Sequence, residues 1–112
     1  MDNHILIVED ESKLREVLCD YFRSKGELPQ EARDGAEALE LAETVSFDAV
    51  LLDIMMPQLD GFAVCRALRK RSDVPILFLT ALSDEEDKLL GYELGADDYI
   101  TKPFTMSVLY AK

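Results

Sequence analysis

The stretch HILIVED, residues 4–10, is an apolar run that ends on two acids, Glu9 and Asp10. The same order returns in AVLLD at residues 49–53 and in PILFLT, residues 75–80, which ends on a threonine. Further runs lie at residues 28–32 and, more weakly, 98–101, and longer amphipathic stretches separate all of them. Such an alternation is typical of β-α units, whose parallel sheet is covered on both faces.

The alternation predicts an α/β fold, a doubly wound sheet of five parallel strands in the (βα)5 pattern. Pro29 lies inside the second run, and a proline cannot donate to a central hydrogen-bond ladder. The second strand is therefore expected at an edge, which agrees with the strand order 2-1-3-4-5. With 112 residues, 48% of them hydrophobic, the chain is long enough for one core and too short for two.

The helices are predicted from periodicity and capping residues. In the first helix, one apolar stripe consists of Leu14, Val17, Leu18, Tyr21 and Phe22, and Gly26 follows as a C-terminal cap. The later helices are expected to start at Asp34 (with Glu37), Asp60 (before Gly61), Ser83 (with Glu86) and Thr105. The fifth helix is expected to be short, since the sequence ends at Lys112.

Composition limits the choice of partners and compartments. The formal net charge of −11 repels the phosphate backbone of nucleic acid, so contact with DNA would need another domain. The apolar runs are too short for a membrane span and the N-terminus lacks a signal-peptide layout, so a cytoplasmic protein is expected. Cys19 and Cys65 lie at helical apolar spacing and are interpreted as reduced packing residues.

Five polar residues end or follow the predicted strands: Glu9, Asp10, Asp53, Thr80 and Lys102. The carboxyl ends of parallel strands meet at one edge of the sheet, where ligands bind at the reversal of strand order. Three carboxylates gathered there repel one another unless some are protonated or a cation lies among them. Oxygen ligands suit Mg²⁺, whereas zinc prefers His or Cys, and the single histidine, His4, begins its strand at the opposite end.

Asp53 suits the role of a nucleophile. A carboxylate can attack phosphorus when a metal and cations offset the developing charge, and the product is an aspartyl phosphate. Lys102 would bind the incoming phosphoryl group and Thr80 would offer its hydroxyl. Taken singly, these residues also have simpler interpretations: Glu9 and Asp10 as acids at a helix N-terminus, Lys102 as a loop lysine, Thr80 as a strand end. Asp53 has no such simple interpretation, because a charge directly after an apolar run costs free energy unless a partner compensates it.

Beyond these positions, the whole chain resembles the receiver domains of bacterial two-component response regulators. The matching stretches are ILIVEDE at residues 5–11, DGAEAL at 34–39, DIMMP at 53–57, DG at 60–61, LTA at 79–81 and GADDYITKPF at 95–104. The resemblance implies a flavodoxin-like fold. It also implies that Asp53 accepts a phosphoryl group from a sensor histidine kinase, and that the domain catalyses only its own phosphorylation and dephosphorylation.

The resemblance further implies roles for individual residues. Mg²⁺ is expected among Glu9, Asp10, Asp53 and the carbonyl group of Met55, and Lys102 is expected to precede a cis Pro103. On phosphorylation, Thr80 would turn toward the phosphoryl group and Tyr99 would rotate inward behind it. That movement would reshape the face made by helix four, strand five and helix five.

Around Lys102 the sequence is most similar to the OmpR-like subfamily, whose members carry a C-terminal winged-helix DNA-binding domain and dimerise through that face. The chain departs from the subfamily pattern at residues 106–108. Because the fifth helix is expected to be short, we expect residues 1–112 to be a receiver domain whose output domain is absent from this chain. The simplest source is a regulator of transcription. A homodimer is a further possibility.

Two alternatives stay open. A stand-alone phosphorelay receiver would share these residues and lack a DNA-binding output. A Mg²⁺-dependent phosphohydrolase also uses an aspartate nucleophile, but that class places a second acid two residues later, where this chain has Met55. A P-loop nucleotide site is excluded, because no glycine-rich loop ends in Lys-Ser or Lys-Thr.

Overall fold

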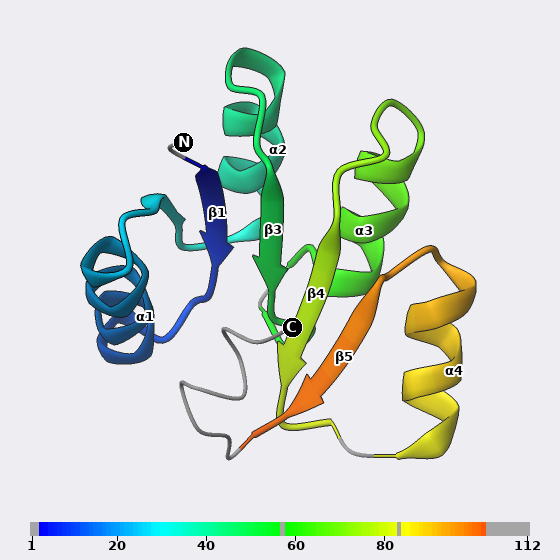
Figure 1. The fold of residues 1–112 in the computed structure, drawn as a ribbon. Coiled ribbons are helices and arrows are strands. Elements are labelled where there is room, and N and C mark those ends of the chain that lie inside the picture. Colours follow the sequence, from blue (N-terminus) through cyan, green and yellow to red (C-terminus); the bar gives the residue numbers. More distant parts are fainter. Residues whose placement is uncertain (1–2, 57, 83, 103–112) are drawn as a thin grey trace.

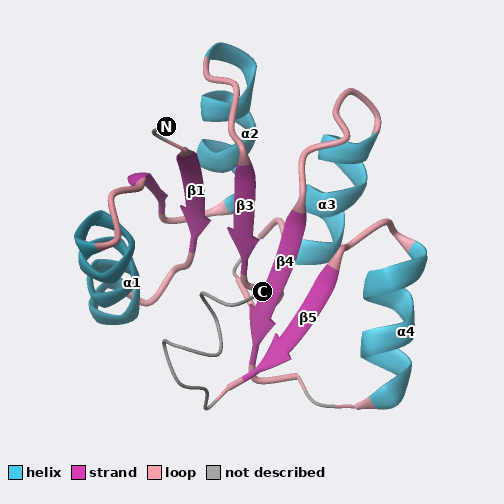
Figure 2. Cartoon of the chain, in the orientation of Figure 1, coloured by secondary structure: helices cyan, strands magenta, loops and turns pink. Residues whose placement is uncertain are grey.

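The computed structural model describes residues 3–56, 58–82 and 84–102. Its five parallel strands form one sheet in the order β2-β1-β3-β4-β5, which confirms the predicted fold class and strand order (Figures 1 and 2). The strands are β1 (His4–Val8), β2 (Leu28–Ala32), β3 (Ala49–Leu52), β4 (Ile76–Thr80) and β5 (Asp98–Thr101). β4 begins one residue later than predicted, although the carbonyl group of Pro75 still accepts the N–H of Val50 at 2.8 Å.

Within the described residues the helices are α1 (Ser12–Ser24), α2 (Gly35–Thr44), α3 (Gly61–Arg69) and α4 (Glu85–Glu93). α1 covers one face of the sheet, α2 and α3 cover the other, and α4 lies beside β5 (Figure 1). Alternate strand residues point to opposite faces, so one core holds Ile5, Ile7 and Leu51 under α1 and the other holds Leu6, Val8 and Leu52. No helix in the described ranges is long and apolar enough to cross a membrane.

The C-terminus of α1 ends as predicted. Gly26 has a positive φ of 87°, and its N–H donates to the carbonyl oxygen three residues earlier at 3.1 Å. The N–H of Glu27 donates to the carbonyl oxygen of Phe22, also at 3.1 Å. Together these bonds form a Schellman motif. The apolar stripe is narrower than predicted, because Val17 is 50% exposed; Cys19 is buried, as predicted.

The N-termini of α2 and α3 are capped as predicted. The carboxylate of Asp34 accepts the N–H of Glu37 at 2.9 Å, and that of Asp60 accepts the N–H of Ala63 at 2.9 Å. α4 follows Asp84, whose side chain makes no capping hydrogen bond. The helix therefore begins one residue later than a Ser83 cap would place it. Four predictions lie outside the described residues: the cap at Ser83, the cis peptide bond at Pro103, the cap at Thr105 and the short fifth helix.

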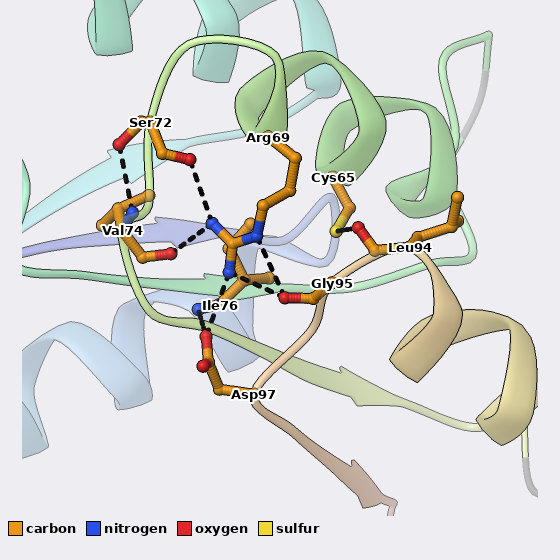
Figure 3. Close-up of polar contacts among 8 residues, drawn as sticks. All are labelled: Cys65, Arg69, Ser72, Val74, Ile76, Leu94, Gly95 and Asp97. Atoms are coloured by element: carbon orange, nitrogen blue, oxygen red, sulfur yellow. Dashed lines mark hydrogen bonds and ion pairs between the residues drawn. The ribbon is translucent and has the colours of Figure 1, made fainter.

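Arg69 joins the loops before β4 and β5 at the amino ends of these strands (Figure 3). Its guanidinium group donates to the carbonyl oxygen of Gly95 from Nε at 3.0 Å and from Nη2 at 2.8 Å, and to that of Val74 from Nη1 at 2.6 Å. Nη2 also lies 3.0 Å from Oδ2 of Asp97, an oxygen that accepts the N–H of Ile76 at 2.8 Å. The cluster closes the end of the sheet opposite the predicted site.

Candidate functional site

The strand register brings the predicted site residues to one edge of the sheet. β1 and β3 end in register, so Glu9 and Asp53, the residues that follow them, lie at the same level. β4 and β5 also end in register, at Thr80 and Thr101, and Lys102 comes directly after. The convergence is therefore a property of the parallel sheet, in which all strands end on the same side.

Glu9, Asp10 and Asp53 form the acidic cluster of this edge. One carboxylate oxygen from each lies within 4.8 Å of the other two. Glu9 and Asp53 are only 2% and 4% exposed, whereas Asp10 is exposed. Buried carboxylates this close repel one another strongly unless a cation is present. The donors are all oxygen atoms, so the cluster fits a hard divalent cation rather than zinc.

Lys102 brings one positive charge to the cluster. Its Nζ donates to Oε1 of Glu9 at 2.9 Å and to Oδ2 of Asp53 at 3.2 Å. Burial by itself would lower the pKa of Lys102, but the hydrogen bonds and charges of the two carboxylates outweigh that effect and raise it. The ammonium group therefore stays charged and bridges the ends of β1 and β3.

Glu9 shows that one ammonium group does not neutralise the cluster. Burial raises the pKa of Glu9 to about 7, against the lowering effect of the Lys102 hydrogen bond and with a further increase from the charge of Asp53. Its Oε2 also accepts the N–H of Glu11 at 3.1 Å. Burial thus outweighs the nearby Lys102 ammonium group, and a charged Glu9 carboxylate at neutral pH would need additional positive charge. A divalent cation would supply it.

Asp53 is oriented by the backbone around it. Its N–H donates to the carbonyl oxygen of Val8 at 3.0 Å, and its Oδ1 accepts the N–H of Met55 at 3.1 Å. Gly61 lets α3 start beside this turn, because a Cβ at that position would lie 2.3 Å from the carbonyl oxygen of Asp53. The sequence marks Gly61 as part of a helix start and of a matching motif, but no local pattern signals its close approach to Asp53.

Thr80 and Tyr99 meet at the loop after β4. Thr80 is fully buried, and its Oγ1 accepts the N–H of Leu82 at 3.4 Å. The hydroxyl group of Tyr99 donates to the carbonyl oxygen of the same Leu82 at 2.9 Å. Burial, reinforced by the charges of nearby carboxylates, raises the pKa of Tyr99 to about 12, so the hydroxyl group remains a donor. Tyr99 lies inward, as a buried residue, in this structure.

An open hollow of about 560 Å³ adjoins the acidic cluster. Its lining is mostly apolar and consists of Asp10, Ile54, Met55, Met56, Asp60, Phe62 and Leu82. A group of moderate size can therefore approach the cluster from solvent. His4, by contrast, is exposed at the start of β1, as predicted, and the buried Cys19 and Cys65 are free thiols.

The sequence is similar to those of known signalling proteins. The family model described as the response regulator receiver domain matches residues 5–112. The probable transcriptional regulator ycf27 of Cyanidium caldarium is 48% identical over 110 residues, which cover 98% of this chain and 44% of that protein. The transcriptional regulatory protein BaeR of Escherichia coli O6:H1 is 44% identical over 108 residues, with 96% and 45% covered. The chain thus spans less than half the length of these relatives.

Solved structures agree with the sequence comparisons. The receiver domain of the Francisella response regulator 1452 superimposes with a TM-score of 0.92 at 36% identity, covering 97% of this chain and 91% of that one. The chemotaxis protein CheY4 of Vibrio cholerae has a TM-score of 0.94 at 32% identity, with 99% and 95% covered. The family model matches nearly the whole chain, and the relatives align over at least 96% of it. The chain therefore belongs to the response regulator receiver domain family.

Proposed function

We propose that this domain accepts a phosphoryl group on Asp53 from a sensor histidine kinase, in a Mg²⁺-dependent reaction, and then changes conformation to control an output. The observation that carries the proposal is the position of Asp53. Its carboxylate is buried, lies 3.2 Å from the ammonium group of Lys102, and belongs to a cluster of oxygen donors at a strand end. Such a carboxylate is preorganised to receive a group that carries negative charge.

In the transfer, an oxygen of Asp53 forms a bond to phosphorus while the bond from phosphorus to the donor's histidine nitrogen breaks. The electron pair of that bond leaves with the nitrogen. Bound Mg²⁺, held by Glu9, Asp10, Asp53 and the carbonyl group of Met55, would offset the charge of the transferred group. Lys102 would hold the phosphoryl oxygens with the ammonium hydrogens that now contact Asp53.

The proposed switch begins at Thr80. The aspartyl phosphate carries close to two negative charges, which favour new charge-assisted hydrogen bonds. We expect the Thr80 hydroxyl to donate to the phosphoryl group and to release the N–H of Leu82. Because Tyr99 binds the carbonyl group of Leu82, a change in this loop would be transmitted to the ring of Tyr99 and to α4.

The output is proposed from the relatives. Proteins named as transcriptional regulators extend well beyond the part that this chain matches, so we propose a winged-helix DNA-binding domain as the output. The acidic receiver would leave DNA contact to that domain. We also propose a homodimer through α4, β5 and the fifth helix, since α4 exposes Leu89, Leu90 and Tyr92. The two buried thiols are compatible with a reducing, cytoplasmic setting.

A phosphohydrolase is a weaker candidate. The position two residues after the nucleophile is Met55, whose side chain is 55% exposed and offers no carboxyl group for proton transfer to a leaving group. We therefore propose that the domain turns over only its own phosphoryl group.

The test is labelling by acetyl phosphate, followed by intact-protein mass spectrometry. The wild-type domain should gain one phosphoryl group when Mg²⁺ is present and none when it is chelated. Asp53→Asn, which keeps the shape and loses the nucleophile, should abolish the gain. Asp73→Asn is the matched control, because Asp73 is an exposed loop acid. Equal labelling of Asp53→Asn and wild type would refute the proposal.

A further inference from the structure

Arg15 reaches from α1 to the backbone beside the acidic cluster. Its Nη1 donates a short hydrogen bond, 2.6 Å, to the carbonyl oxygen of Glu9. Its Nε lies 3.0 Å from Oε1 of Glu31 on β2. The side chain is 16% exposed, and the sequence offered no signal that would assign it a role.

This contact completes the bonding of Glu9. The N–H of Glu9 donates to the carbonyl oxygen of Ala32 at 3.1 Å, and its two carboxylate oxygens bind Lys102 and the N–H of Glu11. The remaining polar group of Glu9 is its carbonyl oxygen, which Arg15 holds. Asp10 follows on the next peptide unit and is exposed, so the backbone that Arg15 fixes also sets the place of Asp10.

Charge alone would argue against an arginine here. A guanidinium group close to a cation site repels the cation and weakens its binding. In this structure Arg15 points at a neutral carbonyl group and at Glu31, an acid outside the cluster. These contacts suit a residue that orients the metal ligands, and Glu31 offsets part of the charge of Arg15.

We propose that Arg15 is a positioning residue for the metal site: by holding the carbonyl group of Glu9, it keeps Glu9 and Asp10 where their carboxylates can meet Mg²⁺. The inference rests on the proposed function. Groups that orient metal ligands from behind typically contribute about 10- to 100-fold to affinity. Arg15 acts through the backbone, so we expect the lower end of that range.

The experiment measures the Mg²⁺ dissociation constant by titration of amide NMR signals, for wild type and three variants. Arg15→Gln should bind Mg²⁺ about tenfold more weakly. Arg15→Lys should lie between the two, because its single nitrogen can hold the Glu9 carbonyl group but lacks the planar fork through which two separate nitrogens of Arg15 reach Glu9 and Glu31. Arg23→Gln is the control: it removes the same charge from the same helix, and Arg23 forms an exposed pair with Asp20 at 3.3 Å.

The sign of the change separates positioning from charge. If Arg15 acted only through its charge, Arg15→Gln would bind Mg²⁺ more tightly than wild type, and that result would overturn the inference. Labelling of Arg15→Gln by acetyl phosphate should return to the wild-type rate at saturating Mg²⁺, whereas a loss that Mg²⁺ does not restore would also overturn it. A wild-type domain without Mg²⁺ affinity would sink the proposed function itself. Normal wild-type binding with an unaffected Arg15→Gln would refute only the positioning role.

Discussion

The hydroxyl group of Tyr99 donates a hydrogen bond of 2.9 Å to the carbonyl oxygen of Leu82. The N–H of Leu82 in turn bonds to Oγ1 of Thr80, so both proposed switch residues contact one residue of the β4–α4 loop. The Tyr99 ring also lies against α4, where a Cβ at Gly91 would come within 3.1 Å of it. Tyr99 therefore links β5, the loop and α4.

The Tyr99→Phe variant tests this link. Removing the hydroxyl group leaves the carbonyl of Leu82 without its donor, so we expect the free energy of unfolding to fall by about 1 kcal/mol in urea denaturation. Labelling of Asp53 should continue. Tyr92→Phe is the control, since its hydroxyl contacts Asp98 at 3.4 Å on an exposed surface. An equal loss in both variants would contradict the prediction.

Gly61 is expected to be essential for both stability and labelling. In Gly61→Ala the new Cβ would lie 2.3 Å from the carbonyl oxygen of Asp53, and relieving such crowding costs about 1–3 kcal/mol. The shift would displace Asp53, so labelling by acetyl phosphate should be lost. Gly26→Ala has no atom within 4 Å of its Cβ but a φ of +87°. It should cost about 1 kcal/mol through backbone strain and label normally. Normal labelling of Gly61→Ala would refute this role.

Glu9 should make the stability of the metal-free domain depend on pH. Its pKa rises from the ordinary 4.5 to about 7 on folding, so the folded form holds the proton more tightly. This contribution is complete below about pH 4.5 and is lost as the pH rises through about 7. At about pH 8, Glu9→Gln should therefore have a free energy of unfolding higher than that of wild type by the order of 1–3 kcal/mol, measured by urea denaturation.

The same comparison at about pH 5 should show a smaller difference, because wild-type Glu9 is then largely protonated. Glu11→Gln, at an exposed neighbour, serves as the control and should show no such trend. A stability difference between Glu9→Gln and wild type that stays constant with pH would speak against the raised pKa. Chelator must be present throughout, since a bound cation would favour the charged carboxylate.

Arg69 is expected to matter for stability and not for the chemistry. In Arg69→Met the carbonyl groups of Gly95 and Val74 and the carboxylate of Asp97 lose their donor (Figure 3). We expect a loss of about 2–4 kcal/mol in the free energy of unfolding. Arg66→Met, at an exposed position of the same helix, should cost far less. Labelling of Asp53 should be unchanged at a temperature where the variant is folded, and a selective loss of labelling would contradict this assignment.

Much of the fold could be predicted because its signals are local. β1, β3 and β4 are apolar runs, Pro29 is compatible only with an edge strand, and Asp34 and Asp60 cap helices through bonds to residues three positions away. Where prediction failed, tertiary packing decided. Val17 fits the helical period, but the packing of α1 leaves it 50% exposed, whereas Cys19, predicted to be a packing residue, is buried. The start of α4 at Glu85 has no local signal either, because the side chain of Asp84 before it makes no capping bond.

The sequence by itself determined that Glu9, Asp10, Asp53, Thr80 and Lys102 would meet, because parallel strands all end at one edge of their sheet. Only the tertiary structure decided which groups touch. The bridge from Lys102 to Glu9 and Asp53, the contact of Arg15 with the Glu9 carbonyl and the approach of Gly61 to Asp53 depend on distances between elements. Strand register and helix packing set those distances. No local pattern encodes them, and the raised pKa of Glu9 follows from burial that exists only in the folded domain.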